Sequence, residues 1–146
     1  MGNTQHKQMM LDGLLGTIGN IRNFRMQAYG VANYIADECK DVLGENSKEK
    51  TLIAVMRAGN AFVSTFITHM PNAQIHFVAA KRNSETFESE ILWHTLKDAT
   101  QDNTDIILLE PMLATGGTMY KIVDLIDSIL LPRSITVASA FSSKEA

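Results

Sequence analysis

Apolar runs of strand length alternate along the chain with segments of helical spacing. The runs that predict strands are residues 51–56, 74–80, 105–109 and 134–141. Apolar residues that recur at three- and four-residue steps predict helices over residues 24–39, 61–70 and 119–131, and a short helix over residues 91–100. This alternation predicts an α/β fold with right-handed crossovers and a mostly parallel twisted sheet, covered by helices on both faces.

The length of the chain limits how many domains it forms. With 146 residues, 45% of them hydrophobic and 20% charged, the composition is that of an ordinary globular protein. We therefore expect residues 1–146 to form a single domain. Residues 44–50 and 81–90 are polar and predict connecting loops.

Charge and cysteine content exclude several classes of protein. The 13 basic and 16 acidic residues give a net charge of −3, with no block of like charges, so neither a nucleic acid nor a membrane is expected as a partner. The single cysteine, Cys39, has no internal partner for a disulfide, which favours a reducing compartment. The first ten residues have no apolar signal core, and no apolar run is long enough to cross a bilayer. We expect a cytoplasmic protein.

In parallel sheets of this kind, ligands bind beyond the carboxyl ends of the strands. Three loops are expected there: "RAGN" after the first strand, "KRNSET" after the second and "EPMLATGGT" after the third. All three carry groups suited to phosphate. The four histidines and Cys39 show no metal-ligand spacing, so no metal bound by the protein itself is predicted.

The third loop, residues 110–118, places an acid, hydroxyl donors and two glycines between a strand and a helix. The amino end of a helix presents unpaired N–H groups, and glycines let an anion come close to them. Glu110 is placed to accept hydrogen bonds from sugar hydroxyls, so this order suits a sugar phosphate. The alternative is a strand-to-helix turn that uses glycines for geometry alone, and the glycines by themselves favour it. The loop is neither a Walker loop nor a dinucleotide fingerprint.

The segment "LLEPMLATGGT" resembles the phosphoribosyl-diphosphate signature of the uracil phosphoribosyltransferase family. That family writes an apolar strand followed by Asp-Pro-Met-Leu-Ala-Thr-Gly-Gly-Ser, so Glu110 stands in place of its aspartate and Thr118 in place of its serine. "VMRAGNAF" and "AAKRNSETFE" resemble two further segments of the family, in the same order. The residues that the resemblance implies for binding phosphoribosyl diphosphate are Arg57, Ala58, Gly59, Arg82, Glu110, Pro111, Met112, Leu113, Ala114, Thr115, Gly116, Gly117 and Thr118.

The resemblance implies a reaction as well as a site. A uracil-type enzyme joins a pyrimidine base to the anomeric carbon of phosphoribosyl diphosphate and releases pyrophosphate, as in pyrimidine salvage. The implied catalytic residues are Glu110, Arg57 and Arg82. Magnesium is expected through the ligand, to stabilise the charge that grows on the departing diphosphate together with the arginines. The resemblance also implies a homodimer.

The chain departs from the family in three respects. It ends at "SAFSSKEA", where the family continues into a base-recognition segment, and its first half is shorter, so we expect a short or truncated member. Glu110 is one methylene longer than the usual acid, which shifts its oxygens by about 1 Å. Two functions therefore stay open: an active transferase, or a non-catalytic regulatory or degenerate paralogue that binds phosphoribosyl diphosphate. A scaffold without a ligand is a third alternative.

Overall fold

The structure is a computed structural model that describes residues 3–44, 49–83, 85–86, 88–99 and 103–144. The elements, in chain order, are α1 (Asn3–Leu15), α2 (Ile21–Leu43), β1 (Lys50–Met56), α3 (Asn60–His69), β2 (Gln74–Arg82), β3 (Ser89–His94), η2 (Leu96–Asp98), β4 (Asp105–Leu109), β5 (Met112–Leu113), α4 (Gly117–Ile129), β6 (Ser134–Ala138) and β7 (Phe141–Ser142).

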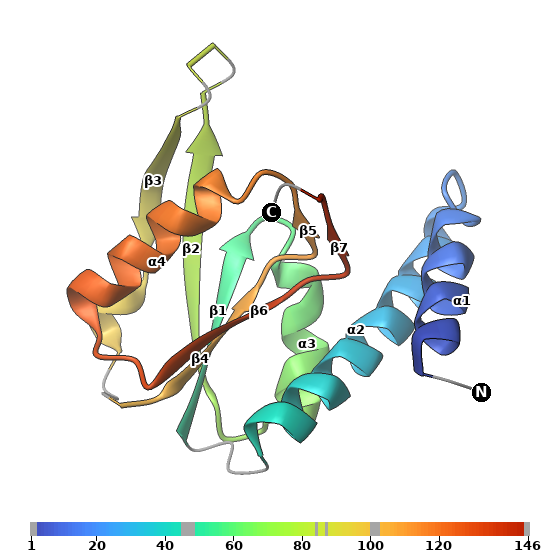
Figure 1. The fold of residues 1–146 in the computed structure, drawn as a ribbon, viewed down its shortest axis with the longest axis horizontal. Helices are drawn as coiled ribbons and strands as arrows, with labels where there is room; N and C mark the ends of the chain where they lie inside the picture. The colour runs from blue at the N-terminus through green and yellow to red at the C-terminus, as the bar shows by residue number, and fades with distance from the viewer. Residues whose placement is uncertain (1–2, 45–48, 84, 87, 100–102, 145–146) are drawn as a thin grey trace.

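A five-stranded sheet with the order β3-β2-β1-β4-β6 forms the centre of the molecule (Figure 1). β1 pairs in parallel with β2 and with β4, and β4 pairs in parallel with β6. Only β3, at one edge of this sheet, runs antiparallel to its neighbour β2. The mostly parallel sheet and the four strands of the alternating pattern are therefore confirmed.

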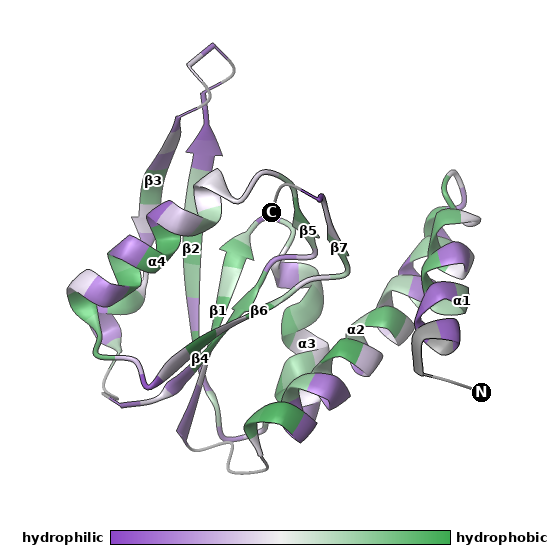
Figure 2. Cartoon of the chain, viewed as in Figure 1, coloured by the Kyte–Doolittle hydropathy of each residue, from purple (hydrophilic) through white to green (hydrophobic). Residues whose placement is uncertain are grey.

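β1 and β4 are buried on both faces because they lie inside the sheet with helices on either side. Leu52 and Ala54 point toward α2 and α3, whereas Ile53 and Val55 point toward α4. Both strands are accordingly coloured as hydrophobic along most of their length in Figure 2. An uninterrupted apolar run is what a parallel strand covered on both faces requires.

Helix α2 covers one face of the sheet with the side that its spacing predicts. Its buried residues include Val31, Ala36 and Cys39, and Asn20 caps its amino end by accepting a hydrogen bond from the amide of Asn23. Burial raises the pKa of the Cys39 thiol to about 11, so this thiol stays protonated at neutral pH, as a core cysteine does.

At the amino end of β4, the carboxylate of Asp105 holds neighbouring strands together. It accepts two hydrogen bonds from the guanidinium of Arg133, at 3.0 and 2.6 Å, and one from the hydroxyl of Ser134, at 2.7 Å. These bonds hold the pKa of Asp105 below its usual range, with Arg133 as the main cause. Arg133 also donates to Glu49, so the amino ends of β1, β4 and β6 meet at one end of the sheet.

Two predicted elements are wrong in part. Residues 91–94 belong to β3 rather than to a helix, and only Leu96–Asp98 forms a short helical turn; residue 100 lies outside the described residues. Ile91 packs against the α4 side of the core, and its strand forms a hairpin with β2, so pairing overrides the weak helical spacing. Of the polar segment 81–90, which was expected to be a loop, Lys81 and Arg82 end β2 and Ser89 and Glu90 begin β3; residues 84 and 87 lie outside the described residues.

The last predicted strand is also shorter than expected. β6 ends at Ala138, and the chain then turns away from the sheet so that β7 can pair with β5. α1, which the sequence did not predict, packs against α2, and its Lys7 donates to Glu38. β6 is an edge strand of the sheet; the expected homodimer stays a prediction. No helix of the described residues is long and apolar enough to cross a membrane.

Gly59 sits where the amino end of α3 touches the backbone of both central strands. A Cβ atom added there would overlap the carbonyl oxygen of Leu109 and would lie 2.6 Å from the amide nitrogen of Val55. Since both atoms belong to buried backbone, neither has room to move aside. Glycine is therefore required here for close packing rather than for an unusual torsion.

We expect Gly59→Ala to lower the free energy of unfolding by about 1–3 kcal/mol, because it overpacks the contact of α3 with β1 and β4. Gly30→Ala, within α2, is the matched control. A Cβ added at Gly30 has no heavy atom within 4 Å, and alanine favours the helix over glycine, so this variant is expected to be more stable by about 0.5–1 kcal/mol. Urea denaturation of the three proteins measures both effects. Equal stability of Gly59→Ala and the parent protein would contradict the packing argument.

Candidate functional site

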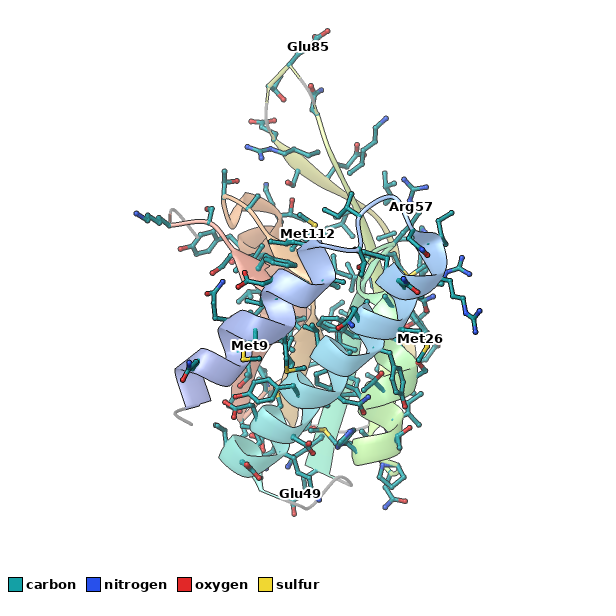
Figure 3. The ribbon with its side chains drawn as sticks, turned by 90° about the vertical axis from the view of Figure 1, so that its right-hand side faces the viewer. Met9, Met26, Glu49, Arg57, Glu85 and Met112 are labelled. Atoms are coloured by element: carbon teal, nitrogen blue, oxygen red, sulfur yellow. The ribbon has the colours of Figure 1, made fainter. Side chains whose placement is uncertain are left out.

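The loops after β1, β2 and β4 lie at one end of the sheet because these strands are parallel and adjacent. Figure 3 shows the consequence: Arg57 and Met112 lie toward one end of the molecule, and Glu49, beside β1's amino end, lies at the other. The predicted positions of "RAGN", "KRNSET" and "EPMLATGGT" at one edge are therefore confirmed. That edge lies opposite the Asp105 and Arg133 pair.

A cavity of about 290 Å³ opens at this edge. Val55 and Met56 of β1, Ala80 and Arg82 of β2, and Glu110 line it, together with the whole segment from Met112 to Met119. Most residues that the sequence nominated in the third loop thus surround one hollow with Arg82. Pro111 and the Arg57–Gly59 segment are absent from its wall.

The amino end of α4 lies in the wall of this cavity. Gly116 precedes the helix with φ +76°, a left-handed torsion that favours glycine, and no side chain among the described residues caps the helix. No acidic residue lies in the first turn either. The first N–H groups and the positive end of the helix dipole therefore remain available to an anion.

Gly117 follows Gly116 and has a different reason to lack a side chain. A Cβ atom added at Gly117 would have only the hydroxyl of Thr115 nearby, at 3.9 Å. The protein itself leaves room for a side chain there. The glycine thus keeps open the approach to the helix end, rather than avoiding a clash within the fold.

α3 begins at the same edge of the sheet and resembles α4 in its amino end. Gly59 precedes it, no described side chain caps it, and it has no acidic residue in its first turn. Arg57 and Ala58 are exposed immediately before it. α2, by contrast, has a side-chain cap from Asn20. Unlike α4, however, α3 has amides in its first turn that already donate to backbone carbonyls: Asn60 to Arg57, Ala61 to Ala58 and Phe62 to Gly59. α4, rather than α3, is therefore the helix of this edge that offers its first N–H groups to an anion.

Glu110 is the acid of the cavity and is half-buried at the end of β4. Its Oε1 accepts a hydrogen bond from the amide of Met112 at 3.3 Å, and its own amide donates to the carbonyl of Ala138 at 3.1 Å. Burial raises the pKa of the Glu110 carboxyl, and the Met112 amide partly offsets this. A carboxylate with one oxygen held by the backbone keeps further lone pairs for hydroxyl groups of a ligand.

Two residues that sequence reasoning missed hold the loop in place. The hydroxyls of Ser89, on β3, and Thr118 lie 2.7 Å apart, which ties the hairpin to the first turn of α4. The hydroxyl of Ser143 donates to the carbonyl of Ala114. Neither serine has a sequence signal, because both act across long separations and serines are common in loops.

No group of three or more histidine, cysteine, aspartate or glutamate side chains among the described residues has an arrangement that holds a metal. Glu110 is the acidic side chain in the wall of the cavity.

A family model described as uracil phosphoribosyltransferase matches residues 18–146. The chain is 38% identical over 74 residues to a uracil phosphoribosyltransferase of Aquifex aeolicus, which covers 51% of this chain and 35% of that protein. A uracil phosphoribosyltransferase of Mycoplasmopsis pulmonis is 30% identical over 104 residues, covering 70% of this chain and 48% of that protein. The chain thus spans less than half the length of these two relatives.

A solved structure shows the same fold. The chain superposes on a hypoxanthine-guanine phosphoribosyltransferase of Bacillus anthracis with a TM-score of 0.66 and 19% identity, over 83% of this chain and 69% of that one. At this level of identity the likeness shows the phosphoribosyltransferase fold and leaves the base unassigned.

We expect Glu110→Gln to raise the melting temperature at pH 7. Folding raises the pKa of the Glu110 carboxyl, so the folded state holds the proton more tightly than the unfolded state. This contributes stability below about pH 4, near the ordinary pKa of a glutamate, and the contribution is lost as the pH rises through the raised pKa, which leaves a destabilising buried charge at pH 7. Glutamine keeps the oxygen that Met112 contacts and removes the buried charge. The gain should therefore be present at pH 7 and shrink below about pH 4.

The control for this test is Glu85→Gln at the tip of the hairpin, an exposed position. It should change stability by less than about 0.5 kcal/mol at either pH. Thermal melts from pH 3 to pH 8 give the comparison. A Glu110→Gln protein that is less stable than the parent at pH 7 would contradict the assigned burial of the charge.

Proposed function

Because the chain belongs to the uracil phosphoribosyltransferase family, we propose that its cavity binds phosphoribosyl diphosphate and transfers the phosphoribosyl group to uracil. The products are uridine monophosphate and pyrophosphate. The observation that carries this proposal is the meeting of Arg82, Glu110 and the uncapped amino end of α4 in one cavity. Each group matches a different part of a phosphorylated sugar.

The 5-phosphate belongs at the amino end of α4 in this proposal. Backbone N–H groups of residues 115–119 and the helix dipole attract an anion, and Gly117 leaves space for it. The hydroxyls of Thr115 and Thr118 add donors. Thr118 is already held by Ser89, so its hydroxyl is positioned before the ligand arrives.

Glu110 is the partner proposed for the ribose hydroxyls. It follows β4 directly and is fixed by the amide of Met112, so its free lone pairs have a defined direction. Burial strengthens the hydrogen bonds that a carboxylate accepts, since the local dielectric is lower than that of water. Binding of hydroxyl donors also offsets the cost of holding this charge in a half-buried place.

The diphosphate belongs beside Arg82 and the amino end of α3, with Arg57 at its outer side. Magnesium, which would be held by the diphosphate beside Arg82 and Arg57, would add to the stabilisation of the negative charge there. Arg82 lines the cavity from the end of β2, and Arg57 is exposed at the start of the α3 turn. Both side chains can donate to phosphate oxygens through planar pairs of N–H groups.

The reaction then exchanges one bond at the anomeric carbon for another. The bond to the diphosphate oxygen breaks, and pyrophosphate leaves with its electron pair. The ring nitrogen of the base forms the new bond and releases its proton. The residues of the chain contribute by orienting the sugar and by stabilising the charge on the departing diphosphate.

One observation favours the second candidate, a regulatory or degenerate paralogue that binds phosphoribosyl diphosphate without turning it over. Arg57, an expected catalytic residue, is absent from the wall of the cavity. The phosphate loop, residues 110–118, lines the cavity with every residue except Pro111. In this alternative, binding is retained and transfer is lost. The two candidates share the site and differ only in turnover.

We expect Gly117→Val to abolish binding of phosphoribosyl diphosphate while the protein still unfolds cooperatively. The branched side chain would fill the space before the helix end and keep the phosphate from its N–H groups, yet its Cβ has only the hydroxyl of Thr115 nearby, at 3.9 Å. Gly117→Ala, which adds only a Cβ, should give an intermediate loss. Calorimetric titration measures affinity, and normal binding by the valine variant would mean that this loop is only a turn.

The proposed function is tested by thermal shift and by transfer of radiolabelled uracil. Phosphoribosyl diphosphate with magnesium should raise the melting temperature. At a ligand concentration of 100 times the dissociation constant, the free energy of unfolding should increase by about 2.7 kcal/mol. Arg82→Ala should remove most of this shift, and Arg25→Ala, an exposed arginine on α2, should leave it intact. Formation of uridine monophosphate identifies the enzyme; a shift without product identifies the binding protein. No shift at all would contradict the site.

A further inference from the structure

The first half of the phosphate loop, residues 110–114, is paired with residues 138–143. The amides of Ala140 and Phe141 both donate to the carbonyl of Pro111, each at 3.1 Å. Ser143 holds the next part of the loop, with its amide on the carbonyl of Leu113 at 2.9 Å and its hydroxyl on the carbonyl of Ala114. β5 and β7 thus form a small parallel sheet of their own, apart from the main sheet (Figure 1).

This pairing also determines where Glu110 points. Successive peptide groups of an extended chain face opposite sides, so the carbonyls of Pro111 and Leu113 face β7 while the amide of Met112 faces away from it. That amide donates to Oε1 of Glu110. The backbone direction set by β7 therefore also places the donor that orients the acid.

The second half of the loop has a separate support. The left-handed torsion of Gly116 turns the chain into α4, and the hydroxyl contact of Thr118 with Ser89 fixes the first turn of that helix. The loop is thus held at its start by β7 and at its end by the hairpin. A disturbance of β7 should displace residues 110–114 and leave the start of α4 attached to the sheet.

We infer that β7 is a positioning element of the ligand site, and that Phe141 and Ser143 are positioning residues for the phosphate loop and Glu110. The inference rests on the proposed function, since it assigns these residues a role in holding the sugar phosphate. They act through Pro111, Leu113 and Ala114, whose carbonyls they bind, rather than by touching the ligand. Residues 142–144 are exposed, so they contribute little buried area to the core.

The backbone amides of β7 point alternately toward β5 and away from it, which offers a matched pair of variants. The amides of Phe141 and Ser143 face β5, so the amide of Ser142, between them, faces away. Ser143→Pro removes the bond to Leu113 and the bond to Ala114, whereas Ser142→Pro removes an amide that the loop does not use. Proline is tolerated in an edge strand where the missing N–H faces outward. Ser143→Ala removes the hydroxyl bond alone.

Three probes separate the parts of the site, and calorimetry measures each of them with the full-length chain. Ribose 5-phosphate needs the loop and Glu110, magnesium pyrophosphate needs the arginines, and phosphoribosyl diphosphate needs both. We expect Ser143→Pro to weaken ribose 5-phosphate and phosphoribosyl diphosphate by roughly 10- to 100-fold. Magnesium pyrophosphate should bind within about twofold of the parent protein, and Ser143→Ala should give a smaller loss of the first two ligands.

Ser142→Pro should bind all three probes as the parent protein does, and both proline variants should melt cooperatively within a few degrees of it. The inference is overturned if Ser143→Pro binds ribose 5-phosphate normally, or if it weakens magnesium pyrophosphate to the same degree, because a general loss of structure would do that. The failure of the proposed function has a different signature: the parent protein itself would bind neither ribose 5-phosphate nor phosphoribosyl diphosphate.

Discussion

The parallel pairing of β1 with β4, buried on both faces, is the constraint on which the rest of the structure depends. Leu52 pairs with Ile107 and Ala54 with Leu109 in one continuous register, so both strands end at the same edge of the sheet. Gly59 allows α3 to begin directly against these strand ends. The loops that follow β1 and β4 therefore lie side by side, and the cavity forms between the loop after β4 and the carboxyl ends of β1 and β2.

That edge collects features that favour an anion. α4 begins there without a side-chain cap, Arg82 lines the cavity, and Glu110, an acid in its wall, is held by the amide of Met112. The cation and anion that stabilise the fold, Arg133 and Asp105, lie at the other end of the sheet and compensate each other. Stability and ligand chemistry are thereby separated along the strands.

Sequence reasoning identified the parallel sheet and the third loop because both depend on local signals. Buried parallel strands are read from runs such as residues 105–109, and the loop from its glycines and from its resemblance to a known signature. It missed the strand nature of residues 91–94, since their pairing with β2 is a tertiary contact that local spacing does not encode. It missed Ser89 and Ser143 for the same reason: their partners, Thr118 and Ala114, lie 29 residues away.

Hydrogen–deuterium exchange of the backbone amides tests the central claim, that the cavity edge binds a phosphorylated sugar, most directly. Exchange is followed with and without phosphoribosyl diphosphate and magnesium. The account predicts slower exchange at residues 115–119, where N–H groups at the amino end of α4 would gain a phosphate partner. Amides beside Asp105 and Arg133, at the opposite end of the sheet, should be unaffected. Unchanged exchange at residues 115–119 under saturating ligand would contradict the account.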